Sequence, residues 1–298
     1  MGGEDMRILV TGGKGFIGKH LIKKLKKEHT VFCYDLVDFN DIRDPETLAR
    51  FFKNSKCDTV VHLAALAGVR NSTIYPSAYI TTNILGTLNV VRMCEKYKCR
   101  LINFSSSSVY GTATPPTKED DKKNPISIYG MTKLAAEQIV NMAKIPTVTI
   151  RPFTVYGPNG RPDQVFYKWL NQYMRNEKIT AYTQRNDISI RGYTYVDDIV
   201  SVVLTLVSKL WHSQCHEDFN IGGTEYITIN QIAEIYASIL PHFMDNFQRL
   251  PRPSEDISRN YADISKAKKL LDFNPKKNFK KNLEDIIRKE QKSWKKLA

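Results

Sequence analysis

Apolar residues follow two alternating patterns along the first half of the chain. Short apolar runs predict strands, and between them lie longer stretches whose apolar residues recur every three or four positions, as in amphipathic helices. The strands are expected at Met6–Val10, Thr30–Asp35, Thr59–Leu63, Arg100–Ser105 and Thr147–Arg151, and the helices at Phe16–Lys27, Pro45–Asn54, Tyr79–Lys98 and Ile128–Ala143. This alternation predicts an α/β fold with a doubly wound parallel sheet.

The pattern becomes less regular after Pro152. A loop-rich stretch leads to a helix expected at Gln164–Asn176, and a strand and a helix follow around Arg191–Leu210 before a helical tail. We therefore expect a Rossmann-type domain over residues 1–152 and a smaller C-terminal substrate-binding lobe over residues 153–298. Residues from about 191 to 215 are expected to return to the first domain.

Composition narrows the classes of partner. The chain of 298 residues has a formal net charge of +13, which suits an anionic partner such as nucleic acid or a nucleotide-bearing small molecule. The lysines are dispersed and form no basic stripe interleaved with aromatic residues, so nucleic-acid binding is not expected. No apolar run approaches the roughly 20 residues that span a bilayer, so no membrane association is expected. Five cysteines without a close C-x-x-C pair favour a reducing, cytoplasmic location.

A metal site is not predicted either. His212, Cys215 and His216 lie close together in the sequence, but a fourth ligand is missing nearby. Solvated side chains explain such a cluster equally well.

A glycine triplet follows the first expected strand. The segment TGGKGFIGKH places Gly12, Gly15 and Gly18 between a strand and a helix, where a dinucleotide fold needs a tight turn, close approach of the pyrophosphate and close helix packing. Glycines of an ordinary loop are the alternative. Asp35 ends the second strand, where its carboxylate suits the two ribose hydroxyls of NAD and repels the 2′-phosphate of NADP. It would otherwise be a turn residue.

A tyrosine and a lysine lie four residues apart on a predicted helix. Tyr129 and Lys133, in SIYGMTKLAAE, therefore share one helix face. A lysine ammonium favours the phenolate, so Tyr129 is a candidate general base. The same spacing is also typical of a solvated helix face.

Several motifs together resemble a known family. The segments TGGKGFIG, HLAA, SSSSVYG, YGMTK, RPFTVYGP and YTYVDDIV occur in the order and spacing of the extended short-chain dehydrogenase/reductases, the NAD-dependent nucleotide-sugar epimerases and dehydratases. The resemblance covers nearly the whole chain. It implies a tightly bound NAD, a nucleotide-sugar substrate and a homodimer built from two paired helices of each subunit, including the helix of Tyr129.

The same resemblance implies a role for individual residues. The family's catalytic serine lies four residues before the tyrosine of the VYG segment, which makes it Ser106 here. Tyr129 would remove the proton of the sugar 4-hydroxyl, Lys133 would hold the nicotinamide ribose, and Ser106 would hydrogen-bond the 4-oxygen. Ser106 would otherwise be a strand-end serine that bonds its own backbone.

Binding residues are implied in the same way. Besides Gly12, Gly15, Gly18 and Asp35, those expected to contact the cofactor are Phe16, Ile17, Asp41, Ile42, Leu63, Ala64, Ala65, Asn83, Ser105, Tyr129, Lys133, Phe153 and Val155. Those expected to contact the substrate are Arg70, Ser106, Ser107, Tyr129, Thr154, Arg161, Tyr182, Arg191 and Arg252.

The residues after Ser106 separate the reactions of this family. Its 4,6-dehydratases carry Asp-Glu there, and its UDP-glucuronate decarboxylases carry Glu at the second position, whereas this chain has Ser107 and Ser108. That favours a 4-epimerase. The shortened segment after Asp35, NDIRDPETL, instead resembles the family's 4-keto-sugar reductases.

The preferred substrate follows from two other segments. AGVRNS and RPFTVYGPNGRPD resemble the UDP-glucuronate 4-epimerases, where Thr154 and Arg161 would lie near the sugar carboxylate. The guanidinium fork of an arginine matches a carboxylate, although Arg161 would otherwise be a loop arginine in water. The alternatives are a 4-epimerase of UDP-glucose and UDP-galactose, or of the N-acetylhexosamines. A non-catalytic NAD-binding sensor or scaffold is a further alternative, but such relatives typically lack the catalytic tyrosine or lysine.

Overall fold

A six-stranded parallel sheet forms the centre of the computed structural model, which describes residues 5–183, 189–209, 216–253, 256–276 and 278–294. The strands lie in the order β10-β5-β4-β3-β1-β2, and every neighbouring pair is parallel. Their bounds are β1 (Arg7–Thr11), β2 (Thr30–Tyr34), β3 (Thr59–His62), β4 (Arg100–Phe104), β5 (Thr147–Pro152) and β10 (His216–Ile221). The Rossmann-type α/β fold is confirmed, and the first five strands lie within one residue of their predicted positions.

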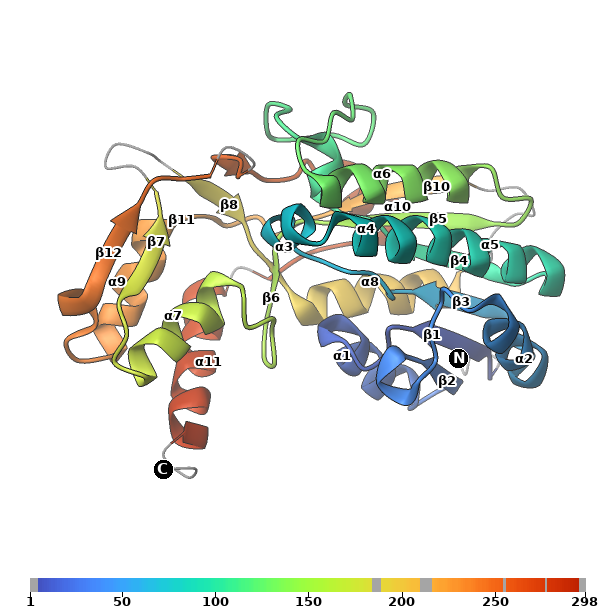
Figure 1. Cartoon of the computed structure of the whole chain (residues 1–298), viewed down its shortest axis with the longest axis horizontal. Coiled ribbons are helices and arrows are strands. Elements are labelled where there is room, and N and C mark those ends of the chain that lie inside the picture. Colours follow the sequence, from blue (N-terminus) through green and yellow to red (C-terminus); the bar gives the residue numbers. More distant parts are fainter. Residues whose placement is uncertain (1–4, 184–188, 210–215, 254–255, 277, 295–298) are drawn as a thin grey trace.

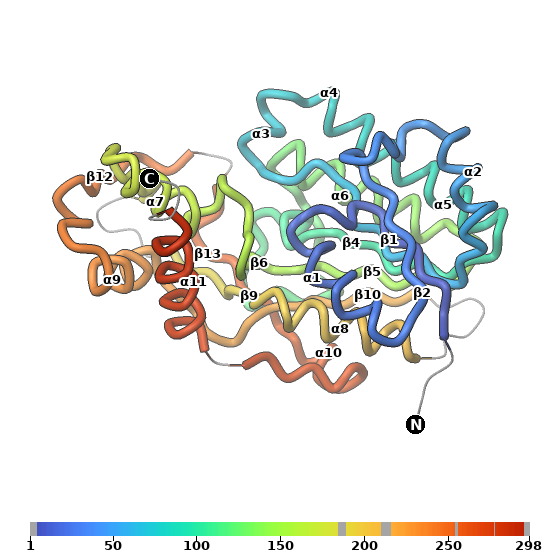
Figure 2. Tube along the Cα trace, turned by 90° about the horizontal axis from the view of Figure 1, so that it is seen from below, coloured from blue at the N-terminus to red at the C-terminus, as the bar shows by residue number. Residues whose placement is uncertain are grey.

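Helices cover both faces of this sheet (Figure 1). On one face α1, α8 and α10 share an apolar core with the strands, and on the other face α2, α5 and α6 do so. Their bounds are α1 (Phe16–Leu25), α2 (Pro45–Ser55), α5 (Gly86–Tyr97), α6 (Ile128–Asn141), α8 (Val196–Ser208) and α10 (Ser265–Leu271). Figure 2 shows α1, α8 and α10 side by side along the sheet.

The chain reverses its direction across the sheet after β2. Strand β1 pairs with β2 on one side and with β3 on the other, and the short turn η1 (Leu36–Asp38) leads from β2 toward α2. The sheet thus has its topological switch point between β1 and β3. Parallel α/β sheets bind ligands at the carboxyl ends of the strands beside such a point.

The single helix expected at Tyr79–Lys98 is interrupted. It consists of α4 (Pro76–Tyr79), a π-helical turn η2 (Ile80–Leu85) and α5, and a short helix α3 (Val69–Ile74) precedes it. The side chain of Asn83, within the π turn, bonds the backbone N–H and C=O of Leu66 at 2.8 and 3.0 Å. A periodic apolar pattern does not show such a local widening of the helix.

A second lobe packs around aromatic side chains. Its core includes Trp169, Tyr193, Tyr236, Phe243 and Phe279, all buried. Its helices and turns are α7 (Val165–Met174), α9 (Ile229–Ile239), η4 (Phe243–Asn246) and α11 (Phe279–Trp294). Its short strands are β6 (Val155–Tyr156), β7 (Ile179–Tyr182), β8 (Ile190–Gly192), β9 (Thr194–Tyr195), β11 (Tyr226–Thr228), β12 (Phe247–Leu250) and β13 (Arg259–Asn260).

Two segments lead back from this lobe to the sheet. Helix α8 packs against α1, and β10 pairs with β5 along its whole length, from His216 beside Thr147 to Ile221 beside Pro152. The sheet therefore receives its sixth strand from a segment that lies after the second lobe has begun.

Candidate active site

Two adjoining cavities lie where the carboxyl ends of the strands face the second lobe. The larger has a volume of about 570 Å³ and the smaller about 300 Å³, and both are lined by Thr154, Arg161 and Arg191. The predicted site residues that line the larger one are Gly12, Gly15, Phe16, Ile17, Gly18, Leu63, Ala65, Ser105, Ser106, Ser107, Tyr129, Lys133, Thr154, Val155, Arg161 and Arg191. Arg70 and Tyr182 line the smaller one.

The glycine turn forms one wall of the larger cavity. Gly12 has a φ of +69°, and a Cβ there would lie 2.6 Å from the backbone nitrogen of Ala64, so only glycine fits. Gly15 begins α1 without a side-chain cap, and no acidic residue occupies the first turn of that helix. Free backbone N–H groups at such a helix end bind anions.

Six of the predicted cofactor-contact residues lie outside both linings. They are Asp35, Asp41, Ile42, Ala64, Asn83 and Phe153, all predicted on the cofactor side. Ile42 is buried against Gly86 of α5, and Asp41 forms an ion pair with Arg43. In the shortened segment after β2, the Ile42 side chain therefore packs into the fold, whereas the Asp41 side chain is partly exposed to solvent.

The other four residues make contacts within the protein instead. Asp35 accepts backbone N–H groups from Lys14 and Val37 at 2.8 and 3.0 Å, which shapes the turn next to the glycines. The Ala64 N–H is bonded to Thr11, Asn83 holds Leu66, and Phe153 is fully buried against Tyr110. On the substrate side, Arg252 also lies outside both linings, with its Nη1 at 3.4 Å from Ser189 Oγ.

Ser106, Tyr129 and Lys133 meet in the larger cavity. Ser106 follows β4 and caps η3 (Ser107–Tyr110), while Tyr129 and Lys133 project from one face of α6. Burial raises the pKa of the Tyr129 phenol, and a hydrogen bond with Ser106 and the charge of Arg161 oppose this rise. The sequence predicted that Lys133 would lower the pKa of Tyr129. In the structure Ser106 and Arg161 have this effect instead.

Lys133 contacts the main chain at the end of β4. Its Nζ donates a hydrogen bond to the backbone carbonyl of Phe104. Burial lowers its pKa to about 8, and Glu137, one helical turn further along, opposes that shift. Lys133 is thus a buried amine whose pKa of about 8 lies close to neutral pH.

A hydrogen-bond chain lies behind the cavity and was not found from the sequence. His62 is fully buried, and burial and the charge of Lys133 lower its pKa to about 3, so the ring is neutral. Its Nδ1 lies 2.7 Å from Thr11 Oγ1 and its Nε2 lies 3.0 Å from Thr87 Oγ1. Because Thr87 donates its own proton to the carbonyl of Asn83, the imidazole donates from Nε2 and accepts at Nδ1.

The four serines after β4 have different environments. Ser106 Oγ lies 3.2 Å from Ser108 Oγ, and Ser107 accepts a hydrogen bond of 3.0 Å from Asn260 of the second lobe. Ser105 Oγ is buried at the cavity and has no hydrogen-bond partner among the described residues. A polar ligand in the cavity would satisfy that hydroxyl.

The smaller cavity is lined by four cationic side chains, those of Arg70, Arg161, Lys168 and Arg191, and by the carboxylates of Asp163 and Asp256. Arg161 binds Asp163 through both arms of its fork, at 3.0 and 2.5 Å, and Arg191 binds Asp256 at 2.6 Å. The guanidinium of Arg70 lies 3.9 Å from the centre of the Tyr182 ring.

Sequence reasoning missed the two acidic partners. Both lie in segments singled out for their arginines, GRPD and PRPSED, but their pairing with Arg161 and Arg191 depends on how these loops fold. Lys168 was also missed, and its ammonium lies 4.6 Å from the centre of the Tyr182 ring.

Neither a metal site nor a membrane-spanning helix occurs among the residues that the structure describes. No group of three or more His, Cys, Asp or Glu side chains there is arranged to hold a metal ion. His212 and Cys215 lie outside the described residues, and His216 bonds Thr147 at 2.8 Å. Among the described helices, none combines the length and the apolar character needed to cross a bilayer.

Comparison with known proteins agrees with this geometry. Residues 8–222 match the model of the "NAD dependent epimerase/dehydratase family". A UDP-glucuronate 4-epimerase of Thermodesulfobacterium geofontis is 32% identical over 89% of this chain and 81% of its own length.

Solved structures are similar over almost the whole chain. MoeE5 in complex with UDP-glucuronic acid and NAD superposes with a TM-score of 0.86 at 29% identity, covering 96% of this chain and 99% of that one. The UDP-glucuronic acid 4-epimerase of Bacillus cereus, with UDP-glucuronic acid and NAD, gives a TM-score of 0.84 at 30% identity, covering 95% of this chain and 99% of that one.

The burial of Lys133 leads to a measurable prediction. With lysines ¹³C-labelled at Cε, one resonance is expected to titrate near pH 8, because burial disfavours the charged ammonium. That resonance should be missing in Lys133→Met and present in a control, Lys24→Met, on the exposed side of α1. Titration of every lysine near the ordinary value of about 10.4 would contradict the described burial.

Proposed function

The chain belongs to the NAD dependent epimerase/dehydratase family, and from that premise we propose that it interconverts UDP-sugars that differ in configuration at C4. The observation that carries this proposal is the convergence of Ser106, Tyr129 and Lys133 on one cavity that adjoins a second, arginine-lined cavity. The two residues after Ser106 are neutral serines. Asp256, the carboxylate that lines the larger cavity, is paired with Arg191.

The cavity fits NAD by its shape and its donors. Glycine at position 12 lets the turn pack against the backbone of Ala64, the uncapped start of α1 offers N–H groups to a pyrophosphate, and Ser105 offers an unpartnered hydroxyl. Asp35 lies at the end of β2, where a ribose would be bound in this type of fold. Bound NAD supplies a reversible acceptor for the hydrogen and two electrons removed from a sugar carbon.

The chain's own residues supply the proton chemistry. Tyr129 takes the proton of the sugar 4-hydroxyl and returns it, while Ser106 donates a hydrogen bond to the same oxygen as it becomes a carbonyl. Arg161 and Ser106 both lower the cost of forming the phenolate, which burial raises. Without an added acid or base beside Ser106, reduction of the opposite face of the ketone is the simplest continuation, and it gives the 4-epimer.

The preferred pair of substrates is UDP-glucuronate and UDP-galacturonate. Thr154 and Arg161 line both cavities, and the Arg161 fork already binds one carboxylate, that of Asp163, with two hydrogen bonds. The remaining Nη1 donors and the Thr154 hydroxyl would receive the sugar carboxylate.

The runner-up pair is UDP-glucose and UDP-galactose. One specific observation favours it: Asp163 already neutralises Arg161, which leaves less net positive charge for a second carboxylate. MoeE5 has been solved with UDP-glucose as well as with UDP-glucuronic acid.

Tyr129→Phe tests the proton chemistry. Loss of the phenolic oxygen should abolish turnover, because the proposed mechanism assigns the 4-hydroxyl proton to that oxygen. NAD affinity, measured by titration calorimetry, should change little. Tyr75→Phe, which alters an exposed tyrosine, is the matched control and should turn over normally. Retained activity in Tyr129→Phe would overturn the mechanism.

A substrate comparison tests the sugar. The protein is incubated with NAD, without reductant, and with UDP-glucuronate, UDP-glucose or UDP-N-acetylglucosamine, and NMR follows the products. Arg161→Met should lower kcat/KM for UDP-glucuronate by about 10- to 100-fold, since a hydrogen bond to a charged group contributes about 1.5–3 kcal/mol. UDP-glucose should be affected less, and Arg175→Met, at an exposed position on the same lobe, should affect neither.

Each contrary result favours a named alternative. Conversion of UDP-glucose but not of UDP-glucuronate would reject the carboxylate role of Arg161. A need for stoichiometric NAD(P)H would indicate a 4-keto-sugar reductase. Bound NAD with no turnover of any nucleotide sugar would indicate a sensor or scaffold protein.

We also infer a homodimer formed through the helices beside the site. The π turn η2 packs against α6, and this region exposes Ile80, Leu85 and Met131, which are 43%, 51% and 54% accessible. Pairing of two copies would remove this apolar surface from water.

Met131→Glu should therefore shift the molar mass from dimer to monomer in light scattering, whereas Lys24→Glu, on α1, should not. A monomeric wild-type protein would contradict the inference.

A further inference from the structure

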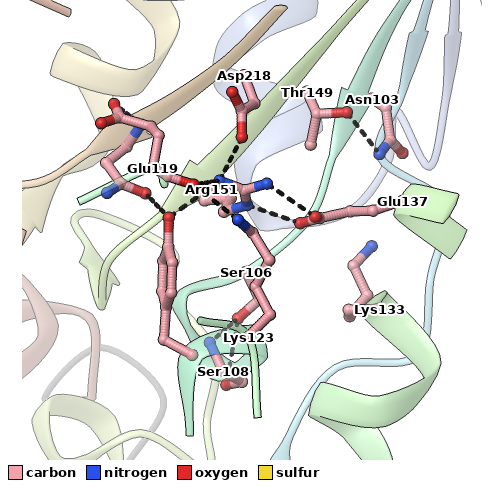
Figure 3. A network of polar contacts seen from close by, with 12 residues as sticks. Asn103, Ser106, Ser108, Glu119, Lys123, Lys133, Glu137, Thr149, Arg151 and Asp218 are labelled. Atoms are coloured by element: carbon pink, nitrogen blue, oxygen red, sulfur yellow. Dashed lines mark hydrogen bonds and ion pairs between the residues drawn. The ribbon is translucent and has the colours of Figure 1, made fainter. Parts of the chain in front are cut away.

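A buried arginine connects the two elements that hold the catalytic side chains. Arg151 lies near the end of β5, is 3% exposed, and binds groups on α6, η3 and β10 (Figure 3). We propose that Arg151 is a positioning residue, which sets the serine turn and the tyrosine helix in one geometry by binding Glu137 and Tyr110 at the same time. The inference concerns the reaction proposed above and rests on it.

The helix is held by a two-bond contact. Tyr129, Lys133 and Glu137 follow one another at intervals of four residues, so they lie along one face of α6. Glu137 is 1% exposed, and its two carboxylate oxygens accept hydrogen bonds of 2.9 Å each from Nε and Nη2 of Arg151. Two parallel bonds restrict both the rotation of the helix and its sliding along the sheet, which one bond would not do.

The serine turn is held by the same guanidinium. Ser106 caps η3 at its start, and Tyr110 ends it four residues later. The Tyr110 hydroxyl accepts a hydrogen bond of 3.0 Å from Arg151 Nη1 and donates one of 2.7 Å to Asn220 on β10. Both ends of the turn are thus defined, one by the strand that precedes Ser106 and one by the arginine.

Charged groups of both signs meet around Arg151. Arg151 carries one positive charge, and it faces the carboxylates of Glu137 and, at 2.5 Å, Asp218. Glu137 also acts on Lys133, whose other neighbours are Tyr129 on its own helix, the neutral His62 on β3 and the carbonyl of Phe104 on β4. Glu137 therefore connects the arginine to the charge state of Lys133.

A buried ion pair is a weak device for stability alone. Desolvation of both charges offsets much of their attraction, and apolar replacements are often as stable. An apolar pair, however, would not provide directional hydrogen bonds to two separate chain segments, as the Arg151 guanidinium does. This distinction separates a positioning role from a merely structural one.

Two conservative substitutions test the proposal. Tyr110→Phe removes one hydroxyl and leaves the ring on Phe153, and Glu137→Gln keeps the shape and removes the charge. Each should lower kcat by about tenfold or more while KM and the Kd for NAD stay within about twofold, because the substrate and cofactor contacts are untouched. Since both act through Arg151, the double variant should lose less than the product of the two single losses.

The pH dependence of kcat is a second measurement, and a merely structural role of Arg151 would leave it unchanged. Glu137 opposes the burial that lowers the pKa of Lys133, so Glu137→Gln should shift the alkaline limb of the kcat profile to lower pH. The labelled-lysine titration should show the same downward shift without any substrate. Tyr110→Phe should leave the Lys133 titration in place.

Thr149→Val is the matched control. Thr149 lies on β5 two residues before Arg151 and accepts a buried hydrogen bond of 3.3 Å from Asn103, so its loss removes a polar contact beside the arginine without touching it. It should lower thermal stability and leave kcat unchanged. An equal fall of kcat in this variant, or variants that melt earlier with an unchanged kcat and lysine titration, would overturn the positioning role.

Failure of the proposed function gives a different result. Wild-type protein that binds NAD but turns over no UDP-sugar would reject the epimerase reaction. The titration of ¹³C-labelled lysines would then still show whether Glu137 raises the pKa of Lys133. An unshifted midpoint in Glu137→Gln would reject the positioning proposal on its own.

Discussion

All six strands of the central sheet run in one direction, and this constraint determines where the chemistry lies. Parallel strands end at the same edge, so the residues that follow β1, β3, β4 and β5 meet there although they are far apart in the sequence. The switch point between β1 and β3 opens that edge, and the positive φ of Gly12 lets the chain turn there against Ala64. The glycine turn, Ser105 and Ser106 lie at this meeting of strand ends.

The second lobe completes the site with charge rather than with reacting groups. Its arginines face the cavity that adjoins Tyr129, and its Asn260 bonds Ser107 across the boundary between the lobes. The acidic partners Asp163 and Asp256 reduce the net charge and also orient the guanidinium groups. These charges belong to the second lobe, whereas Ser106 follows β4 and Tyr129 and Lys133 lie on α6.

Burial gives the helix of Tyr129 and Lys133 an unusual electrostatic environment. Lys133 and Glu137 are almost completely removed from water, and so is Arg151 on the neighbouring strand. In such a place a charge is retained only when it has close partners. The fold provides them through one guanidinium that binds carboxylates from α6 and β10, which ties the geometry of the site to the way the helix packs on the sheet.

The sequence by itself determined much of this protein. The periodicity of apolar residues predicted five of the six sheet strands and most of the helices on the sheet, because each pattern reflects a local repeat of the backbone. The glycine triplet and the Tyr129–Lys133 spacing indicated the cavity residues for the same reason: turns and helix faces are local. Local patterns did not show the π turn at Asn83 or the way the segment of Asp41 and Ile42 turns away from the cavity.

Only the tertiary structure decided which charges meet. Arg191 and Asp256 are 65 residues apart, and Arg151 and Glu137 lie on a strand and a helix, so both pairings depend on how these elements pack. It also decided that Lys133 points at a backbone carbonyl and that Ser106 and Arg161, rather than the lysine, favour the Tyr129 phenolate. The physical reason is that burial and pairing set a pKa, and both are properties of the folded surroundings that no stretch of sequence contains.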